Sequence, residues 1–188
     1  MQRKTKLWQA ALALSAVAIL TFSALVYGQS GSSGTSSTES GASSGRGAKG
    51  PSDLQELNQQ VIQEFRANHG KVGGRYEKTP LLLLTTTGAK SGRAITRPVA
   101  YTKDGERFVV IASYGGGPKN PAWYHNLVAH PEATVEVGRE RLRVKAAVAT
   151  GEERRRLYDQ HAAQLPNFAE YEKKTKRQIP VIVLTRMD

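Results

Sequence analysis

The chain has 188 residues, 39% of them hydrophobic and 23% charged, which suits one globular domain with an appendage. It contains no cysteine, so disulfides, thiolate catalysis and cysteine-ligated zinc are excluded. The formal net charge is +11, and so basic a surface attracts polyanions without choosing among nucleic acid, anionic lipid and a phosphorylated cofactor.

Two segments precede the globular part. After a basic cap, residues 7–27 form an apolar run without a charge, which as a helix would reach about 30 Å and cross a bilayer core. Residues 28–50 are rich in Gly and Ser, which predicts a flexible linker. We expect residues 1–27 to anchor the protein to the plasma membrane. The alternatives are a signal segment cut after Gly28, which leaves an exported protein, and a cytoplasmic location.

Residues 51–188 are expected to form the folded domain. A capping box at Ser52 and Gln55 predicts a helix that stops at Gly70. Strands are predicted at 80–87, which is buried on both faces, at 95–103 and at 107–113. Pro98 indicates that the second of these strands lies at an edge or carries a bulge.

The second half alternates helices with a hairpin. Asn120 is predicted to cap a helix that runs to about residue 129, and Thr150 with Glu153 to cap one that runs to about 164. A hairpin is expected between them, with strands 133–137 and 141–149 around Gly138, then a short helix from Asn167 and a last strand at 179–185. Hairpins with helices inserted between them predict the α+β class, with about six mainly antiparallel strands in a barrel.

The turn after the first strand is the first candidate site. Two glycines allow a tight turn with exposed backbone amides, and the cationic and hydroxyl side chains around them suit a phosphate or a carboxylate. The alternative is an ordinary solvated hairpin turn. The side chains in question are Lys90, Ser91, Arg93, Thr96 and Arg97.

The glycine-rich segment after the third strand is the second candidate. Three glycines permit the backbone to approach a flat ligand, and the helix that follows directs its free amides toward the same place. Trp123 and Tyr124 could flank an aromatic ring, and Asn126 could donate to it. The competing interpretation is a surface loop with Trp123 and Leu127 as core contacts. The four histidines lack metal-site spacing, so no metal is predicted.

Together the two segments resemble the deazaflavin (F420)-dependent nitroreductase family. The resemblance rests on Leu83–Arg93 with Pro98 and on Gly115–Leu127, with the N-P-x-W-Y-x-N-L pattern at its end, and it spans about residues 75–188. It implies a split β-barrel with flanking helices that binds coenzyme F420 and passes a hydride to an apolar acceptor, a quinone such as menaquinone or a nitroaromatic.

The resemblance also implies roles for residues. Lys90, Ser91, Arg93 and Arg97, with Thr96 beside them, would hold the anionic phosphate and glutamyl tail. The ring and ribityl chain would be lined by Pro98, Tyr101, Ala112, Ser113, Tyr114, Asn120, Trp123 and Asn126. Candidate proton donors are Tyr171, Tyr114 and Ser113. The stretch 165–171 retains a single tyrosine, Tyr171, where family members that reduce bulky nitroaromatics carry several, which favours a different acceptor.

Other functions compete with this one. An FMN-dependent oxidase would share the barrel, as would a non-catalytic protein that binds a cofactor or lipid near the membrane. A nucleic-acid partner is not expected, because aromatic residues are not interleaved with the basic ones. The run Lys173–Arg177 is interpreted as a solvated face or a helix end. The sequence predicts no oligomeric state.

Overall fold

The computed structural model describes residues 51–188, so the expected membrane segment (7–27) and linker (28–50) lie outside the described residues. The side chain of Ser52, half of the expected capping box, is also outside the description. The elements are α1 (Pro51–Ala67), β1 (Leu81–Thr87), β2 (Ala94–Asp104), β3 (Arg107–Ile111), α2 (Ala122–Ala129), β4 (Glu132–Val137), β5 (Glu140–Ala149), α3 (Gly151–Gln164), α4 (Asn167–Lys173) and β6 (Val181–Arg186).

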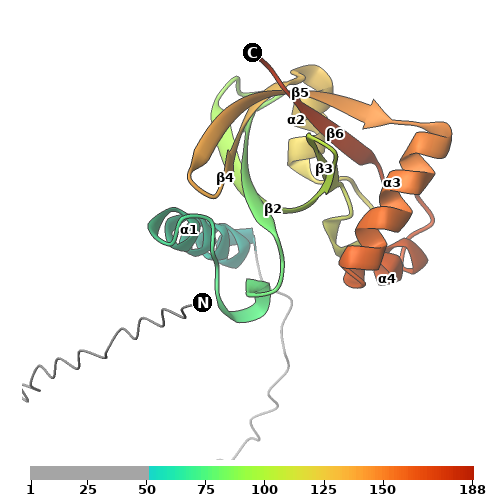
Figure 1. Ribbon diagram of the computed structural model, residues 1–188, viewed down its shortest axis with the longest axis horizontal. Helices are drawn as coiled ribbons and strands as arrows, with labels where there is room; N and C mark the ends of the chain where they lie inside the picture. Colours follow the sequence, from blue (N-terminus) through green and yellow to red (C-terminus); the bar gives the residue numbers. More distant parts are fainter. Residues whose placement is uncertain (1–50) are drawn as a thin grey trace, which may run out of the picture. The chain divides into compact units, whose positions relative to one another are not determined.

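Six strands close into one barrel in the order β1-β2-β3-β6-β5-β4, and every strand pair is antiparallel. In Figure 1, α1 lies on one side of the barrel, and α3 and α4 lie on the opposite side. The predicted α+β barrel of about six strands is therefore confirmed. Within residues 51–188, none of the helices combines the length and the apolar character that crossing a bilayer requires.

β1 is buried on both faces, as its apolar run predicts. Leu82 and Leu84 point into the barrel, where Leu127 of α2 joins the same cluster. Leu81 and Leu83 point outward and are covered by α1 through residues such as Phe65, which is 1% exposed. Burying each such side chain contributes about 1.5–3 kcal/mol, so α1 and α2 are both held by this strand.

The end of α1 depends on Gly70. Its amide donates to the carbonyl of Phe65 at 2.7 Å, and its φ is +94°. A Cβ at this position would lie 2.7 Å from the Cα of Gly138 in the β4–β5 turn. Glycine therefore supplies both the left-handed conformation and the close approach, and the predicted helix stop is confirmed.

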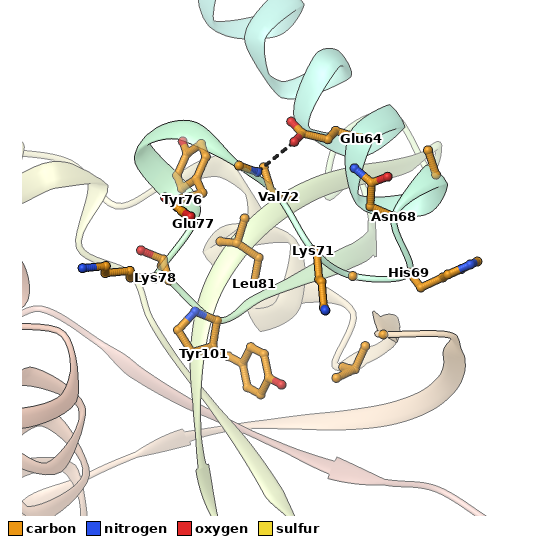
Figure 2. A pocket seen from close by; sticks show the side chains of 17 residues that line it. Glu64, Asn68, His69, Lys71, Val72, Tyr76, Glu77, Lys78, Leu81 and Tyr101 are labelled. Carbon is orange, nitrogen blue, oxygen red and sulfur yellow. Dashed lines mark hydrogen bonds between the residues drawn. The ribbon is translucent and has the colours of Figure 1, made fainter. Parts of the chain in front are cut away.

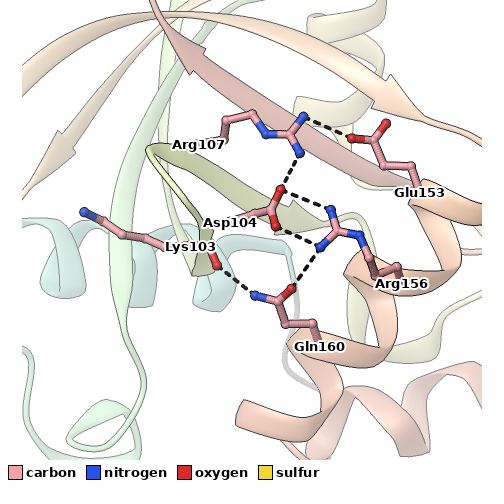
Figure 3. A network of polar contacts seen from close by, with 6 residues as sticks. All are labelled: Lys103, Asp104, Arg107, Glu153, Arg156 and Gln160. Atoms are coloured by element: carbon pink, nitrogen blue, oxygen red, sulfur yellow. Dashed lines mark hydrogen bonds and ion pairs between the residues drawn. The ribbon is translucent and has the colours of Figure 1, made fainter.

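A charged network fastens the β2–β3 hairpin to α3 (Figure 3). Arg156 donates to both carboxylate oxygens of Asp104, at 2.8 and 3.2 Å, and Arg107 also pairs with Asp104. Arg107 reaches Glu153 at 3.0 Å as well. Hydrogen bonds from the guanidinium groups of Arg156 and Arg107 lower the pKa of Asp104 to about 2. The network fixes α3 against the hairpin.

Two predicted side-chain capping bonds are not formed. α2 begins at Ala122 with Pro121 as its N-cap residue, and the side chain of Asn120 binds elsewhere. Thr150 is the N-cap residue of α3, but it makes no side-chain capping bond. Glu153, the other half of that expected capping box, accepts from Arg107 instead. In both cases an arginine distant in sequence binds the side chain that local spacing assigned to a cap.

Candidate functional site

An opening in the sheet separates the first half of β2 from the chain that follows β3. The β2–β3 ladder begins where Tyr101 pairs with Val110, whereas residues 94–100 pair only with β1. Beyond β3 the chain leaves the ladder as residues 112–120, which we name the glycine loop. The two segments on either side of the opening thus share no ladder pairs.

Pro98 lies within this opening. The amide of Tyr101 donates to the carbonyl of Pro80 at 3.1 Å, so these two form a hydrogen-bonded pair in the β1–β2 register. Since such pairs alternate with non-hydrogen-bonded ones, the pair Leu83–Pro98 is of the second kind. The backbone nitrogen of Pro98 therefore faces the opening, a proline removes no bond to β1, and its predicted edge position is confirmed.

The turn between β1 and β2 forms one rim of the site. The amide of Gly92, at φ +64°, donates to the carbonyl of Gly88 at 2.8 Å. The side chains of Lys90, Ser91 and Arg93 are exposed. Within residues 51–188, neither Lys90 nor Arg93 has a carboxylate in ion-pair distance. The turn therefore presents cationic donors that are available to an anion.

Behind this turn, α1 and the start of β2 enclose a pocket of about 420 Å³. Arg93, Thr96 and Arg97 line it from the strand side, and Gln55 and Gln59 line it from α1. Thr96 also shares a 2.8 Å hydrogen bond between hydroxyl groups with Thr85 of β1. A third arginine, Arg66 of α1, also lines the pocket and is paired with Glu136. The pocket therefore places three guanidinium groups beside amide side chains, a donor set that suits carboxylates.

Asn126 joins the two candidate segments. Its side-chain oxygen accepts from the amide of Ala89 at 3.0 Å, and its Nδ2 donates to the hydroxyl of Thr86 at 3.0 Å. The residue is 6% exposed. The sequence suggested that Asn126 donates to a ring; in the structure it ties α2 to the basic turn and so sets the relative position of the two segments.

The glycine loop has an unusual backbone. Tyr114, Gly115 and Gly116 have φ values of +50°, +64° and +82° in succession. A left-handed conformation is uncommon for a tyrosine, and strain of this kind gathers at functional sites. A Cβ on Gly116 would lie 2.9 Å from the carbonyl oxygen of Tyr171, so the loop packs tightly against α4.

Arg177 is the site residue that sequence reasoning missed. Its guanidinium donates to the carbonyls of Ala112, Ser113 and Gly117 at 3.0, 2.7 and 3.0 Å, and to Oδ1 of Asn120 at 2.6 Å. Burial lowers the pKa of this guanidinium. The run Lys173–Arg177 is interpreted from the sequence as a solvated face or a helix end: α4 does end at Lys173, but a solvated face is wrong at Arg177. A basic run gave no signal that would separate this residue from its neighbours.

Two expected ring contacts lie apart from the opening. Tyr101 lies on the opposite face of β2 from Pro98, because successive strand residues alternate. Its ring points into a cavity of about 1140 Å³ bordered by Lys71, Tyr76 and Leu81 (Figure 2), and burial raises the pKa of its hydroxyl. Trp123 packs against the barrel interior, which agrees with the competing core-contact interpretation.

The three candidate proton donors differ in exposure. Ser113 is 7% exposed and Tyr114 is 60% exposed, and both begin the glycine loop. Tyr171 is half-buried, with its ring 5.2 Å from that of Phe168 and the Nζ of Lys174 5.7 Å from its centroid. The Tyr171 ring therefore has a fixed aromatic environment, in the cluster between α3 and the barrel, and only the backbone of Tyr171 touches the glycine loop.

The fold and site define a split-barrel protein with an exposed cationic turn and a constrained glycine loop. The family model for F420H(2)-dependent quinone reductases matches residues 57–186. An F420H(2)-dependent quinone reductase of Mycobacterium tuberculosis (strain ATCC 25618 / H37Rv) is 38% identical over 132 residues, which cover 65% of this chain and 85% of that protein.

Solved structures agree with this match. The structure of an F420-H2 dependent reductase (FDR-A) is 38% identical, covers 56% of this chain and 94% of its own, and has a TM-score of 0.53. A second, described as a domain-swapped dimer, is 35% identical, covers 72% of this chain and all of its own, and has a TM-score of 0.55.

The chain therefore belongs to the F420H(2)-dependent quinone reductase family. The predicted deazaflavin-dependent oxidoreductase of the split-barrel type is confirmed, and coenzyme F420 is the coenzyme that this family uses. The alternative of an FMN-dependent oxidase does not match this family. The unpaired cations of the basic turn fit a coenzyme whose tail is anionic.

Proposed function

We propose that this protein binds reduced coenzyme F420 and reduces a quinone with it. The observation that carries the proposal is the opening between β2 and the glycine loop, which has unpaired cations at one end and a strained, clamped loop along its side. The relatives named for F420H(2)-dependent quinone reduction support the same reaction.

The residues of this chain divide the binding task. Lys90, Ser91 and Arg93, with Arg97 in the adjoining pocket, hold the phosphate and the carboxylates of the tail. Pro98 and the glycine loop line the ring on the two sides of the opening. When bound, the coenzyme supplies the hydride, and the protein orients its ring toward the acceptor and keeps water away.

A proton must accompany the hydride to the quinone. We assign its delivery to the Tyr171 hydroxyl, because the Phe168 ring holds this side chain in place and the backbone of Tyr171 packs against Gly116 of the glycine loop. Ser113 and Tyr114 are the alternatives. A Tyr171→Phe change keeps the ring packing and removes the proton, so we expect kcat for quinone reduction to fall while the affinity for the coenzyme stays unchanged.

The coenzyme proposal is tested by titrating the truncated protein 51–188 with oxidised F420 and with FMN while following fluorescence. We expect preference for F420, weakened roughly tenfold by Lys90→Ala or Arg93→Ala, since a charge-assisted hydrogen bond contributes about 1.5–3 kcal/mol and exposure reduces it. Lys78→Ala, which removes an exposed lysine outside the turn, is the matched control. Preference for FMN would contradict the proposal.

Membrane attachment is a separate proposal, supported by the uncharged apolar run 7–27 and the Gly/Ser-rich segment after it. Such a tether at the plasma membrane places the domain near lipid-soluble acceptors such as menaquinone. We expect full-length protein to sediment with membranes and protein 51–188 to remain in the supernatant. Reduction of water-soluble nitroaromatics, with no turnover of quinones by either form, would contradict the quinone assignment.

A further inference from the structure

Arg177 contacts both ends of the glycine loop. Its Nη2 donates to the carbonyls of Ala112 and Ser113, where the loop begins, and its Nε donates to the carbonyl of Gly117 farther along. The guanidinium group is planar and carries donors but no acceptor, so the carbonyl oxygens of the loop that bind it must all face this one group. Within residues 51–188, no carboxylate lies in ion-pair distance of Arg177.

Two of these contacts lie where the chain leaves the β3–β6 ladder. The amide of Ala112 donates to the carbonyl of Pro180 at 2.9 Å, but a proline has no N–H to return to the Ala112 carbonyl. The Ser113 carbonyl accepts from the amide of Gly116 at 3.0 Å. A buried carbonyl without a partner costs about 1–3 kcal/mol. Arg177 supplies the donor that Pro180 cannot give to Ala112, and it adds a second bond to the Ser113 carbonyl, so the chain can leave the ladder here without that cost.

Arg177 also determines which way the amide of Asn120 faces. Its Nη1 lies 2.6 Å from Oδ1 of Asn120. Because a guanidinium can only donate, the amide must turn its oxygen toward Arg177. The Nδ2 group, with two N–H donors, then faces away from the arginine. Asn120 therefore becomes a donor at the end of the loop, and its polarity is fixed by a residue 57 positions later.

The rest of the loop has little freedom to compensate. Gly116 packs so closely on α4 that an added Cβ would lie 2.9 Å from both the carbonyl oxygen of Tyr171 and the Cβ of Lys174. The amide of Gly116 donates to the carbonyl of Ser113 at 3.0 Å, which closes the left-handed turn. Removing the Arg177 guanidinium group would therefore release the two ends of a loop whose middle stays on α4.

We propose that Arg177 is a positioning residue for coenzyme binding, which holds the glycine loop in its left-handed conformation and presents Nδ2 of Asn120 to the bound coenzyme. The inference rests on the proposed function. It assigns a role in coenzyme binding to a residue outside the two segments that the sequence singled out. Carbonyl and phosphate oxygens are the acceptors that such a donor would meet.

Two substitutions in the full-length protein test the two halves of the proposal. Asn120→Asp keeps an oxygen for Arg177 but replaces the donor with a charged acceptor. We expect the thermal midpoint to be retained or raised, while the affinity for oxidised F420 falls at least tenfold.

Arg177→Lys keeps the charge but loses the planar pair of donor groups. We expect faster amide hydrogen exchange in residues 113–119 without coenzyme, and a KM for reduced F420 about tenfold higher with an unchanged KM for the quinone.

Arg154→Lys is the matched control. Arg154 is a buried arginine that, like the partly buried Arg177, donates to a backbone carbonyl, that of Ile179. It pairs with Glu172 and does not touch the glycine loop. We expect it to change neither loop exchange nor coenzyme affinity. Wild-type-like F420 affinity in Asn120→Asp overturns the donor assignment, and unchanged loop exchange in Arg177→Lys overturns the clamp. If wild-type protein does not bind F420, the proposed function fails, while the exchange measurement still decides whether Arg177 holds the loop.

Discussion

At the scale of single residues, the burial of His161 makes the stability of the domain depend on pH. Its side chain is fully buried, with Nδ1 3.0 Å from the hydroxyl of Thr102 and the ring packed edge-on 4.4 Å from Phe168. Within the described residues Nε2 has no hydrogen-bond partner. Burial lowers the pKa of this imidazole to about 4, from 6.5, because the charged form is poorly solvated there.

This burial makes the domain less stable in mild acid. Between pH 6.5 and pH 4 the unfolded chain binds a proton at His161 that the folded chain does not, so stability falls as the pH drops through this window. We expect the free energy of unfolding to decrease by about 2 kcal/mol from pH 7 to pH 5 through this group. Urea titrations at both pH values measure the change.

His161→Asn supplies the comparison for that titration. Asparagine can keep a hydrogen bond to Thr102 but does not titrate, so the variant should be less stable at pH 7 and lose this part of the pH dependence. His69→Asn, at an exposed histidine with a left-handed backbone that asparagine tolerates, should retain the wild-type dependence. Equal slopes in wild type and His161→Asn would show that burial of this ring is not the cause.

At the scale of elements, Asn126 connects α2 to the turn between β1 and β2. Asn126→Ala removes both side-chain bonds and leaves the amide of Ala89 and the buried hydroxyl of Thr86 without their partner. We expect a loss of about 1–3 kcal/mol in the free energy of unfolding. We also expect weaker F420 binding, because the basic turn loses its fixed distance from the glycine loop.

Calorimetry and the fluorescence titration would measure the two effects separately. The neighbouring change His125→Ala removes an exposed side chain of the same helix and should alter neither quantity. If Asn126→Ala destabilises the domain but binds F420 normally, the two side-chain hydrogen bonds of Asn126 stabilise the fold and do not contribute to coenzyme binding.

The elements themselves were predictable because their patterns are local. The four consecutive leucines of β1 require burial on two faces, and the barrel with α1 outside supplies both. Gly70 and Gly138 mark turns that the structure places against each other. The caps failed for the opposite reason, since Asn120 and Glu153 have partners far away in sequence. Nothing in the spacing of a basic run indicates that one arginine turns inward.

At the scale of the whole molecule, the positive charge should govern coenzyme association. The net charge of +11 and the unpaired cations of the basic turn attract a polyanionic coenzyme, and salt screens this attraction over about 8–10 Å at 0.10–0.15 M. We expect the dissociation constant for F420 to rise severalfold between 50 and 500 mM salt. The lower concentration is below roughly 0.10–0.15 M and the higher one is above it, so the attraction is screened more weakly at the first and more strongly at the second.

The salt dependence can be traced to the turn. Lys90→Ala combined with Arg93→Ala should weaken binding at low salt and flatten its salt dependence, whereas Lys145→Ala, at an exposed position of β5, should leave the slope close to that of wild type. A slope that the turn variants do not change would mean that the charge of the domain as a whole attracts the coenzyme.

Pro98 has a consequence that extends beyond the binding of any coenzyme. Strand backbone that lacks a neighbour invites pairing with another strand, either the chain's own or that of another molecule. The first half of β2 is such an edge, and in its middle, between the outward-facing amides of Thr96 and Ala100, the nitrogen of Pro98 carries no hydrogen to donate. We therefore expect Pro98 to disfavour intermolecular β-sheet aggregation at this edge, apart from any part that it has in binding the coenzyme.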